Sequence, residues 1–192
     1  NVMLAYENRI NALPWMSAPT KAKAIEKLKR LTIKIGYPDK WKDYSKLELK
    51  NVNEGGTYFD NMKNISKWSY SESLAKLGKP VDKTEWGMSP QTVNAYFNPS
   101  YNEIVFPAAI LQPPFYNYQA DEAVNYGGIG AVIGHEISHG FDDSGARYNA
   151  DGNLVDWWTP EDLKQFTTLG TALADQYSAL EPLPGIHVDG KF

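Results

Sequence analysis

The sequence contains no cysteine among its 192 residues. Disulfide bonds and thiolate metal ligands are therefore excluded, so any metal ion must be held by histidine, aspartate or glutamate side chains. A run of about 18 apolar residues is also missing, which excludes a membrane-spanning helix within the chain. No signal peptide begins at Asn1, because polar and apolar residues are mixed there. We expect the chain to be part of a longer protein.

An excess of positive charge is absent as well. The chain has 19 lysine and arginine residues against 23 aspartate and glutamate residues, a net charge of −4. Without a concentrated basic face, binding to nucleic acid is not expected. The hydrophobic share of 42% is sufficient for one core. The sequence therefore predicts a globular protein of one domain or two small lobes.

Apolar residues recur at helical spacing in much of the chain. The predicted helices are residues 1–13, a segment capped by Ser17, residues 57–77 and residues 159–180. In the second of these helices, the lysines and Arg30 form the side that faces solvent. Residues 1–80 thus form a helical scaffold segment, and the segment 81–192 contains the side chains that can bind a metal, bind a substrate or take part in catalysis. We expect the two segments to belong to one continuous domain of the α+β class that is mainly helical.

Alternation of apolar and polar residues predicts short strands. Ile33 and Ile35 indicate one extended piece, which ends in a turn. Residues 92–97 and 103–106 indicate a pair of strands joined by a tight loop. An exposed strand of this kind can pair with an extended peptide through its backbone, and a purely structural hairpin is the alternative.

Two of the three histidines, His135 and His139, lie four residues apart with Glu136 between them. On a helix this spacing places both imidazoles on one face, where they can bind one zinc ion. Glu136 lies about 100° around the helix from His135 and therefore misses the metal. It can instead reach a water molecule bound to the metal, as the general base of a metal-dependent hydrolase does.

The alternative is a histidine pair with an ordinary structural role. The surrounding segment, residues 121–141, is predicted to be one helix with Asp121 as its N-cap and an apolar flank. Polar groups on so apolar a helix must be paired, solvated in a cleft or bound to a metal, because unsatisfied burial costs about 1–3 kcal/mol per group. In this context the pattern favours zinc.

Several sequence blocks, taken in order, closely resemble the neprilysin family of zinc metallopeptidases. The resemblance covers nearly the whole chain, and the order of the blocks makes it specific. The blocks are WM at 15–16, IGYP at 35–38, NAYFNP at 94–99, FPA at 106–108, GGIGAVIGHEISHGFDD at 127–143 and WW at 157–158.

The resemblance implies part of a zincin-like (thermolysin-like) metallopeptidase core that binds Zn²⁺. By this likeness His135 and His139 are zinc ligands, and Glu136 is the base that activates water. The implied reaction is endopeptidase cleavage of short peptides on the amino side of hydrophobic residues. The matching positions for binding the substrate backbone are Asn94 and Ala95, and those for the pocket of its hydrophobic side chain are Ile110, Phe115 and Val132.

One departure from the family pattern concerns the third zinc ligand. In the family this is a glutamate in a Glu-Asn-x-x-Asp motif on a later helix, and no such motif occurs before Phe192. A downstream segment is therefore expected to complete the site, and the chain alone is expected to bind zinc weakly and to have little or no activity. Of the remaining candidates, His187 is not expected to be a ligand, and Asp142 and Asp143 are expected to support the ligands or the helix end.

Two hypotheses thus follow from the sequence. The parent protein is a zinc endopeptidase, or the chain is a non-catalytic peptide-binding or scaffold module with a degenerate metal site. The absence of cysteine favours a bacterial origin within the resembled family. The sequence does not determine the cellular compartment. Export to the periplasm or the extracellular space, and membrane anchoring through an N-terminal part, are both compatible with it.

Overall fold

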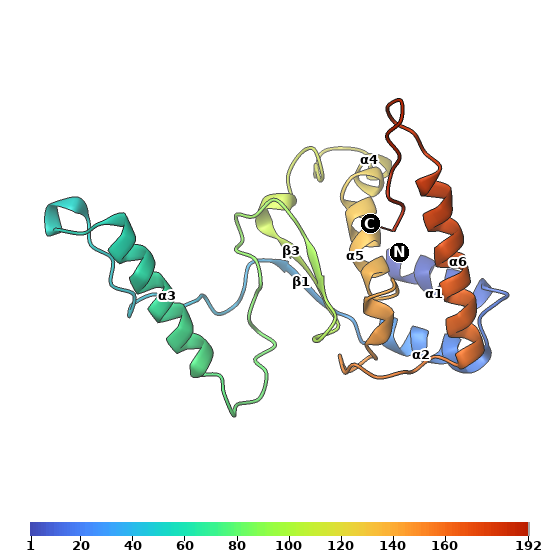
Figure 1. The fold of residues 1–192 in the computed structure, drawn as a ribbon, viewed down its shortest axis with the longest axis horizontal. Helices are drawn as coiled ribbons and strands as arrows, with labels where there is room; N and C mark the ends of the chain where they lie inside the picture. Colours follow the sequence, from blue (N-terminus) through green and yellow to red (C-terminus); the bar gives the residue numbers. More distant parts are fainter. Residues whose placement is uncertain (192) are drawn as a thin grey trace. The chain divides into compact units, whose positions relative to one another are not determined.

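The structure is a computed structural model that describes residues 1–191. Helices predominate and a small sheet accompanies them, which confirms the mainly helical α+β class (Figure 1). The helices are α1 (Val2–Ala12), α2 (Ala18–Lys29), α3 (Tyr58–Leu74), α4 (Glu122–Gly127), α5 (Ile129–His139) and α6 (Pro160–Ser178). The strands are β1 (Thr32–Gly36), β2 (Tyr96–Asn98) and β3 (Glu103–Pro107), with short 3₁₀ turns η1 (Val52–Glu54), η2 (Ala108–Ile110) and η3 (Gly145–Arg147).

The chain divides into two compact units. Residues 1–37 and the described residues from 88 onward form the first unit, and residues 38–87 form the second. These units do not coincide with the segments 1–80 and 81–192 that composition distinguishes. All of the residues implicated above in binding or catalysis belong to the first unit.

The sheet of the first unit has the strand order β1-β3-β2. The predicted hairpin is present, because β2 pairs antiparallel with β3 and Tyr96 lies opposite Val105. β1 joins the other side of β3 in parallel, with Ile33 opposite Ile104. β3 is buried along its whole length, as expected of a central strand. β2 is consequently an edge of this sheet, next to α5.

The helices of the first unit pack through α1, which contacts both α2 and α5. A hydrogen bond fixes the contact between α1 and α5, because the Tyr6 hydroxyl donates to the Gly134 carbonyl over 2.6 Å. Apolar side chains from these helices and from β3 form one core with Ile10, Leu28, Ile104, Phe106 and Ile137 among its buried members.

α2 begins after Ser17, as predicted, but the side chain of Ser17 does not cap its own helix. Its backbone amide instead donates to the Asp162 carboxylate of α6 at 3.1 Å, and its hydroxyl contacts the same carboxylate. Asp162 is only 3% exposed. The amino-terminal ends of α2 and α6 are thereby joined through one buried carboxylate.

The prediction of a single helix over residues 121–141 is wrong. Asp121 does cap α4 by accepting a hydrogen bond from the amide of Ala123. The chain then breaks at Gly128, whose neighbour Ile129 donates its amide to the Phe115 carbonyl at 2.6 Å. A Cβ on Gly128 would lie 2.3 Å from that same oxygen, so only glycine permits this approach. The histidines therefore lie on a separate, shorter helix, α5.

The prediction that all lysines of α2 face solvent is also wrong, because Lys27 is only 2% exposed. Lys27 follows the buried Ala24 by three residues and precedes the buried Leu28, so it belongs to the inner face of the helix. Its long side chain extends through the core to reach polar partners on another segment.

The second unit consists of η1, α3 and the chain around them. Thr57 caps α3 by accepting a hydrogen bond from the amide of Asp60, close to the predicted start. No residue of α3 is buried. A small aromatic contact holds Trp68 of α3 against Tyr44 with ring centroids 5.1 Å apart, and the Lys42 ammonium lies 4.9 Å from the Trp68 centroid.

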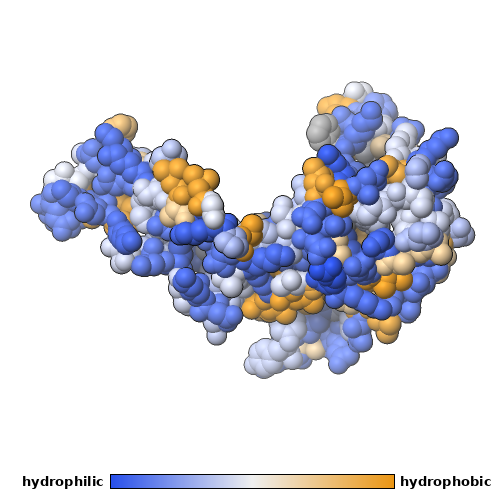
Figure 2. Space-filling view, turned by 90° about the horizontal axis from the view of Figure 1, so that it is seen from below, coloured by the Kyte–Doolittle hydropathy of each residue, from blue (hydrophilic) through white to orange (hydrophobic). Residues whose placement is uncertain are grey.

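Exposed hydrophobic side chains occur in several places. On the face shown in Figure 2 they form separate patches on a mainly hydrophilic surface. Within residues 1–191, none of the helices combines the length and the apolar character that crossing a bilayer requires.

Candidate metal centre

His135 and His139 project from one face of α5, one helical turn apart. Their Nε2 atoms lie 3.0 Å from each other, and their ring planes meet at 81° with centroids 4.5 Å apart. Two zinc–nitrogen bonds of about 2.0–2.1 Å at a tetrahedral angle place their nitrogens about 3.3 Å apart. The two imidazoles therefore already have nearly the separation that one zinc ion requires.

Asp142 fixes the orientation of the second histidine. Its Oδ2 lies 2.8 Å from Nδ1 of His139, while its Oδ1 accepts hydrogen bonds from the amides of Ser144 at 3.0 Å and Gly145 at 2.6 Å. Because a carboxylate only accepts, the hydrogen of the neutral imidazole is on Nδ1. Nε2 of His139 then keeps its lone pair, which is the form that binds a metal.

Glu136 differs from its neighbours in burial. Its residue is only 4% exposed, whereas His135 is exposed and His139 is intermediate. Burial raises the pKa of the Glu136 carboxyl, and attraction to His135 and His139 partly offsets that rise. A carboxylate with a raised pKa is a stronger base than one in water, so this environment suits proton abstraction.

A cavity of about 420 Å³ lies between α5 and the β2 edge. His135, Glu136 and His139 line it from the helix, and Asp142 lines it from the loop that follows. Asn94 and Ala95, the residues predicted to contact substrate, line it from the chain entering β2. The Asn94 side chain accepts a hydrogen bond from the Ala95 amide at 2.9 Å, so its own amide group stays available as a donor.

The residues predicted to form a pocket for a hydrophobic side chain lie elsewhere. Ile110 is 3% exposed within the core cluster, and Phe115 and Val132 pack against that cluster. None of the three is among the residues lining the cavity beside the histidines. Their assignment to substrate binding stays a prediction.

The described residues contain no third side chain that completes a metal site with the two histidines. Among residues 1–191 no group of three or more histidine, aspartate or glutamate side chains is arranged to hold a metal ion. His187 is exposed and does not line the cavity. Asp143, unlike Asp142, lines a different hollow together with Arg147 and Trp158.

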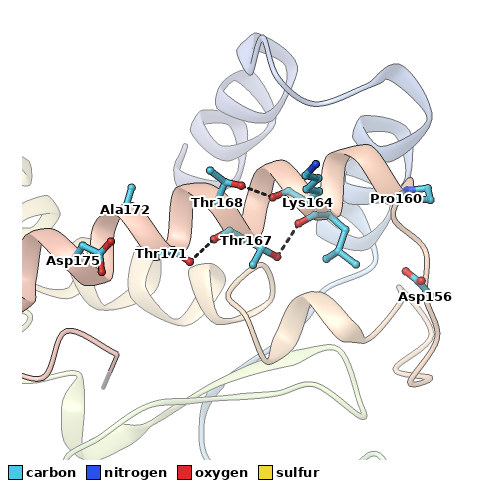
Figure 3. Close-up of a pocket in the computed structure, with 9 residues that line it drawn as sticks. Asp156, Pro160, Lys164, Thr167, Thr168, Thr171, Ala172 and Asp175 are labelled. Carbon is cyan, nitrogen blue, oxygen red and sulfur yellow. Dashed lines mark hydrogen bonds between the residues drawn. The ribbon is translucent and has the colours of Figure 1, made fainter.

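A larger hollow follows the outer side of α6, but it offers little chemistry (Figure 3). Its three threonine hydroxyls donate to carbonyls of the preceding helical turn: Thr167 to Leu163, Thr168 to Lys164 and Thr171 to Thr167, over 2.9–3.0 Å. The donor hydrogens of these hydroxyls are therefore used in hydrogen bonds within α6. In the histidine cavity, by contrast, two imidazoles and two carboxyl groups line one hollow.

Sequence reasoning missed the contribution of Lys27 to this region. The side chain of Lys27 reaches the loop that carries Asp142 and binds its backbone. Its position on the apolar stripe between Ala24 and Leu28 was the available signal, because a lysine on a buried face needs polar partners.

Comparison with known proteins agrees with this arrangement. The sequence profiles of peptidase family M13 match residues 94–192 and residues 1–38. The chain belongs to peptidase family M13. Neprilysin-11 of Caenorhabditis elegans is 46% identical over 182 residues, which cover 92% of this chain and 22% of that protein. Human neprilysin is 42% identical over 191 residues, covering 94% of this chain and 25% of that protein.

A solved structure supports the membership of this M13 chain. The crystal structure of Mycobacterium tuberculosis zinc metalloprotease Zmp1 in complex with an inhibitor is 53% identical, with a TM-score of 0.91. The match covers 99% of this chain and 29% of that one. The M13 chain thus has the fold of the corresponding part of a zinc metalloprotease, and it spans between a fifth and a third of the length of these relatives.

Proposed function

We propose that the protein containing this chain is a zinc-dependent endopeptidase and that the chain supplies two of its zinc ligands and its general base. The observation that carries the proposal is the convergence of two imidazole nitrogens 3.0 Å apart and the buried Glu136 on one cavity beside a sheet edge. The names of the M13 relatives, neprilysin and zinc metalloprotease, support the same activity.

His135 and His139 would hold the zinc ion through their Nε2 atoms, with Asp142 keeping His139 in the required tautomer. When bound, zinc would supply Lewis-acid chemistry by polarising the scissile carbonyl and lowering the pKa of water. We propose that a glutamate from another part of the protein is the third protein ligand. Such a site has three protein ligands and one open position, as catalytic zinc sites do.

Glu136 then acts on the nucleophile. Its carboxylate accepts a proton from water as the water oxygen adds to the scissile carbonyl carbon. The same carboxyl returns that proton to the amine as the carbon–nitrogen bond breaks. The β2 edge and Asn94 would align the substrate backbone, because an edge strand can offer main-chain donors and acceptors to an extended peptide. Cleavage on the amino side of hydrophobic residues is the proposed preference.

The test uses the natural full-length protein and an internally quenched peptide with phenylalanine or leucine after the scissile bond. We expect hydrolysis that stops after treatment with a zinc chelator and returns when zinc is added back. A matched peptide with aspartate in place of the hydrophobic residue should be cleaved far more slowly. If zinc-loaded protein binds the peptide without cleaving it, the module is a peptide-binding one and the proposed activity is wrong.

A further inference from the structure

The side chain of Lys27 ends at three backbone carbonyl groups beside the candidate metal centre. Its Nζ donates to the carbonyls of Gly140 at 2.6 Å, Gly145 at 2.7 Å and Tyr148 at 2.7 Å. An ammonium group has three hydrogens, so all of its donors are used. The residue is 2% exposed, and every one of these partners belongs to residues 140–148, the loop that follows α5.

This is an unusual place for a positive charge. Among the described residues no carboxylate lies within ion-pair distance of the Lys27 ammonium. The aromatic rings of Phe97 and Phe141 lie at 5.8 and 5.7 Å, and the C-terminal end of α5 adds partial negative charge. A buried charge is retained only where its partners compensate for lost hydration, and an apolar residue in place of Lys27 would leave the three carbonyl groups without this donor. The role of Lys27 therefore lies in what the ammonium holds.

A continuous set of hydrogen bonds leads from Lys27 to a candidate zinc ligand. The ammonium binds the carbonyl of Gly145, the amide of Gly145 donates to Asp142 at 2.6 Å, and the other oxygen of Asp142 contacts His139 at 2.8 Å. A second bond, to the Gly140 carbonyl, fixes the start of the same loop. The position of the Asp142 carboxylate thus depends on a loop whose backbone converges on one ammonium group.

The starting point of the Lys27 side chain is itself fixed. The Asn102 side-chain amide donates to the Lys27 carbonyl at 3.0 Å and to the Ala150 carbonyl at 3.2 Å. Asn102 is 1% exposed and lies between β2 and β3. The buried side chain of Asn102 therefore links the hairpin to the end of α2 and to the chain that follows the loop after α5.

We propose that Lys27 is a positioning residue for the metal centre: its ammonium holds residues 140–148 so that Asp142 orients His139 for zinc. This proposal rests on the proposed function in that it assigns zinc to the two histidines. Lys27 does not touch the reacting atoms and acts only through Asp142. Outer partners of metal ligands alter metal affinity or activity by about 10–100-fold when they are removed, and the same range applies here.

The experiment is a double-mutant cycle in the natural full-length protein, with zinc affinity measured by competition against a chelator. The variants are Lys27→Met, Asp142→Asn and the double variant. We expect Lys27→Met to raise the zinc Kd about 10-fold and to lower kcat with little change in KM. The double variant should bind zinc no more weakly than Asp142→Asn alone, because both changes remove one and the same orientation of His139.

The matched control is Leu28→Ala. Leu28 is also 2% exposed and neighbours Lys27 on α2, but it packs in the apolar core. This variant should lower the unfolding temperature and leave the zinc Kd within about twofold of wild type. A general loss of stability in α2 would affect both variants alike, whereas a positioning role affects zinc binding only in Lys27→Met.

Additive effects in the cycle, or an unchanged zinc Kd in folded Lys27→Met, would overturn the positioning role. If Lys27→Met does not accumulate as folded protein, Lys27→Arg replaces it, since a planar guanidinium keeps the charge but cannot direct three hydrogens as an ammonium does. With Lys27→Arg, additive effects in the cycle or an unchanged zinc Kd would again overturn the positioning role.

The cycle also separates this inference from the proposed function. Wild-type protein that binds zinc but cleaves no peptide overturns the proposed function, while the zinc affinities still test Lys27. Wild-type protein that binds no zinc also overturns the proposed function. In that case, nitrogen-15 spectra of the histidine rings in metal-free protein provide the test. In wild type these spectra should place the hydrogen of the His139 ring on Nδ1, and Lys27→Met should lose this preference; an unchanged tautomer would contradict the inference.

Discussion

Asp142 and His139 form a direct contact, 2.8 Å between Oδ2 and Nδ1, in the turn that ends α5. The contact leaves Nε2 of His139 free to face His135. Substitution of Asp142 by asparagine removes the charge and allows the side-chain NH₂ group to face the ring. We expect Asp142→Asn to raise the zinc Kd by about 10-fold or more, measured by chelator competition.

The neighbouring Asp143 offers a control for that change. It lines a separate hollow with Arg147 and Trp158. Asp143→Asn alters the net charge by the same amount and should leave zinc affinity within about twofold of wild type. Equal effects of the two substitutions would show that local charge, and not the contact with His139, determines the affinity.

Glu136 is expected to act on water and not to hold the metal. Glu136→Gln keeps the size of the side chain but removes the base, so kcat/KM should fall by about 10²–10⁴-fold or more. Zinc content after dialysis should equal that of wild type, because the two histidines are untouched. Loss of zinc from this variant would instead place Glu136 among the ligands.

Gly145 is required by the close approach of two backbone segments. A Cβ there would lie 1.8 Å from the His139 carbonyl oxygen, so Gly145→Ala must displace the loop or the end of α5. We expect a loss of about 1–3 kcal/mol in the free energy of unfolding, together with weaker zinc binding. Denaturant titration and chelator competition measure the two effects.

Gly134 is the matched control for that substitution. It lies in the interior of α5, where a Cβ meets nothing within 4 Å. Gly134→Ala should therefore raise the free energy of unfolding by roughly 0.5–1 kcal/mol, as expected when alanine replaces glycine in a helix. A stabilised Gly145→Ala variant would contradict the packing described for the loop.

Asp162 predicts a pH dependence of stability. Burial on its own would raise the pKa of this carboxyl, but hydrogen bonds from Ser17, Thr20 and Thr159 outweigh it and lower the pKa from the ordinary 3.8 to about 2. The folded state therefore prefers the ionised form. Its stabilisation is complete above the ordinary pKa and is lost as the pH falls through about 2.

Asp162→Asn should accordingly unfold more easily than wild type near neutral pH, by about 1–2 kcal/mol. The difference should shrink as the pH falls from about 4 to about 2, because wild type then also carries an uncharged side chain. Thermal unfolding across this range provides the measurement. A difference that grows towards low pH would contradict the role assigned to the carboxylate.

Much of the site follows from the sequence because its parts are local. The four-residue spacing of His135 and His139 is sufficient to place both rings on one face of any helix. A helix cap acts over two or three residues, and the position of the Asp121 cap was predicted correctly. The alternation of polar and apolar residues likewise predicts the pairing of β2 with β3, which are adjacent in the chain.

Tertiary structure decided the features that depend on distant segments. The break at Gly128 follows from the approach of the Phe115 carbonyl, which no helical pattern reveals. The burial of Lys27 depends on carbonyl groups more than a hundred residues away in the chain. Periodicity predicts which face of a helix is apolar, but only packing determines which polar atoms lie opposite that face, because a buried charge is tolerated solely where partners meet it.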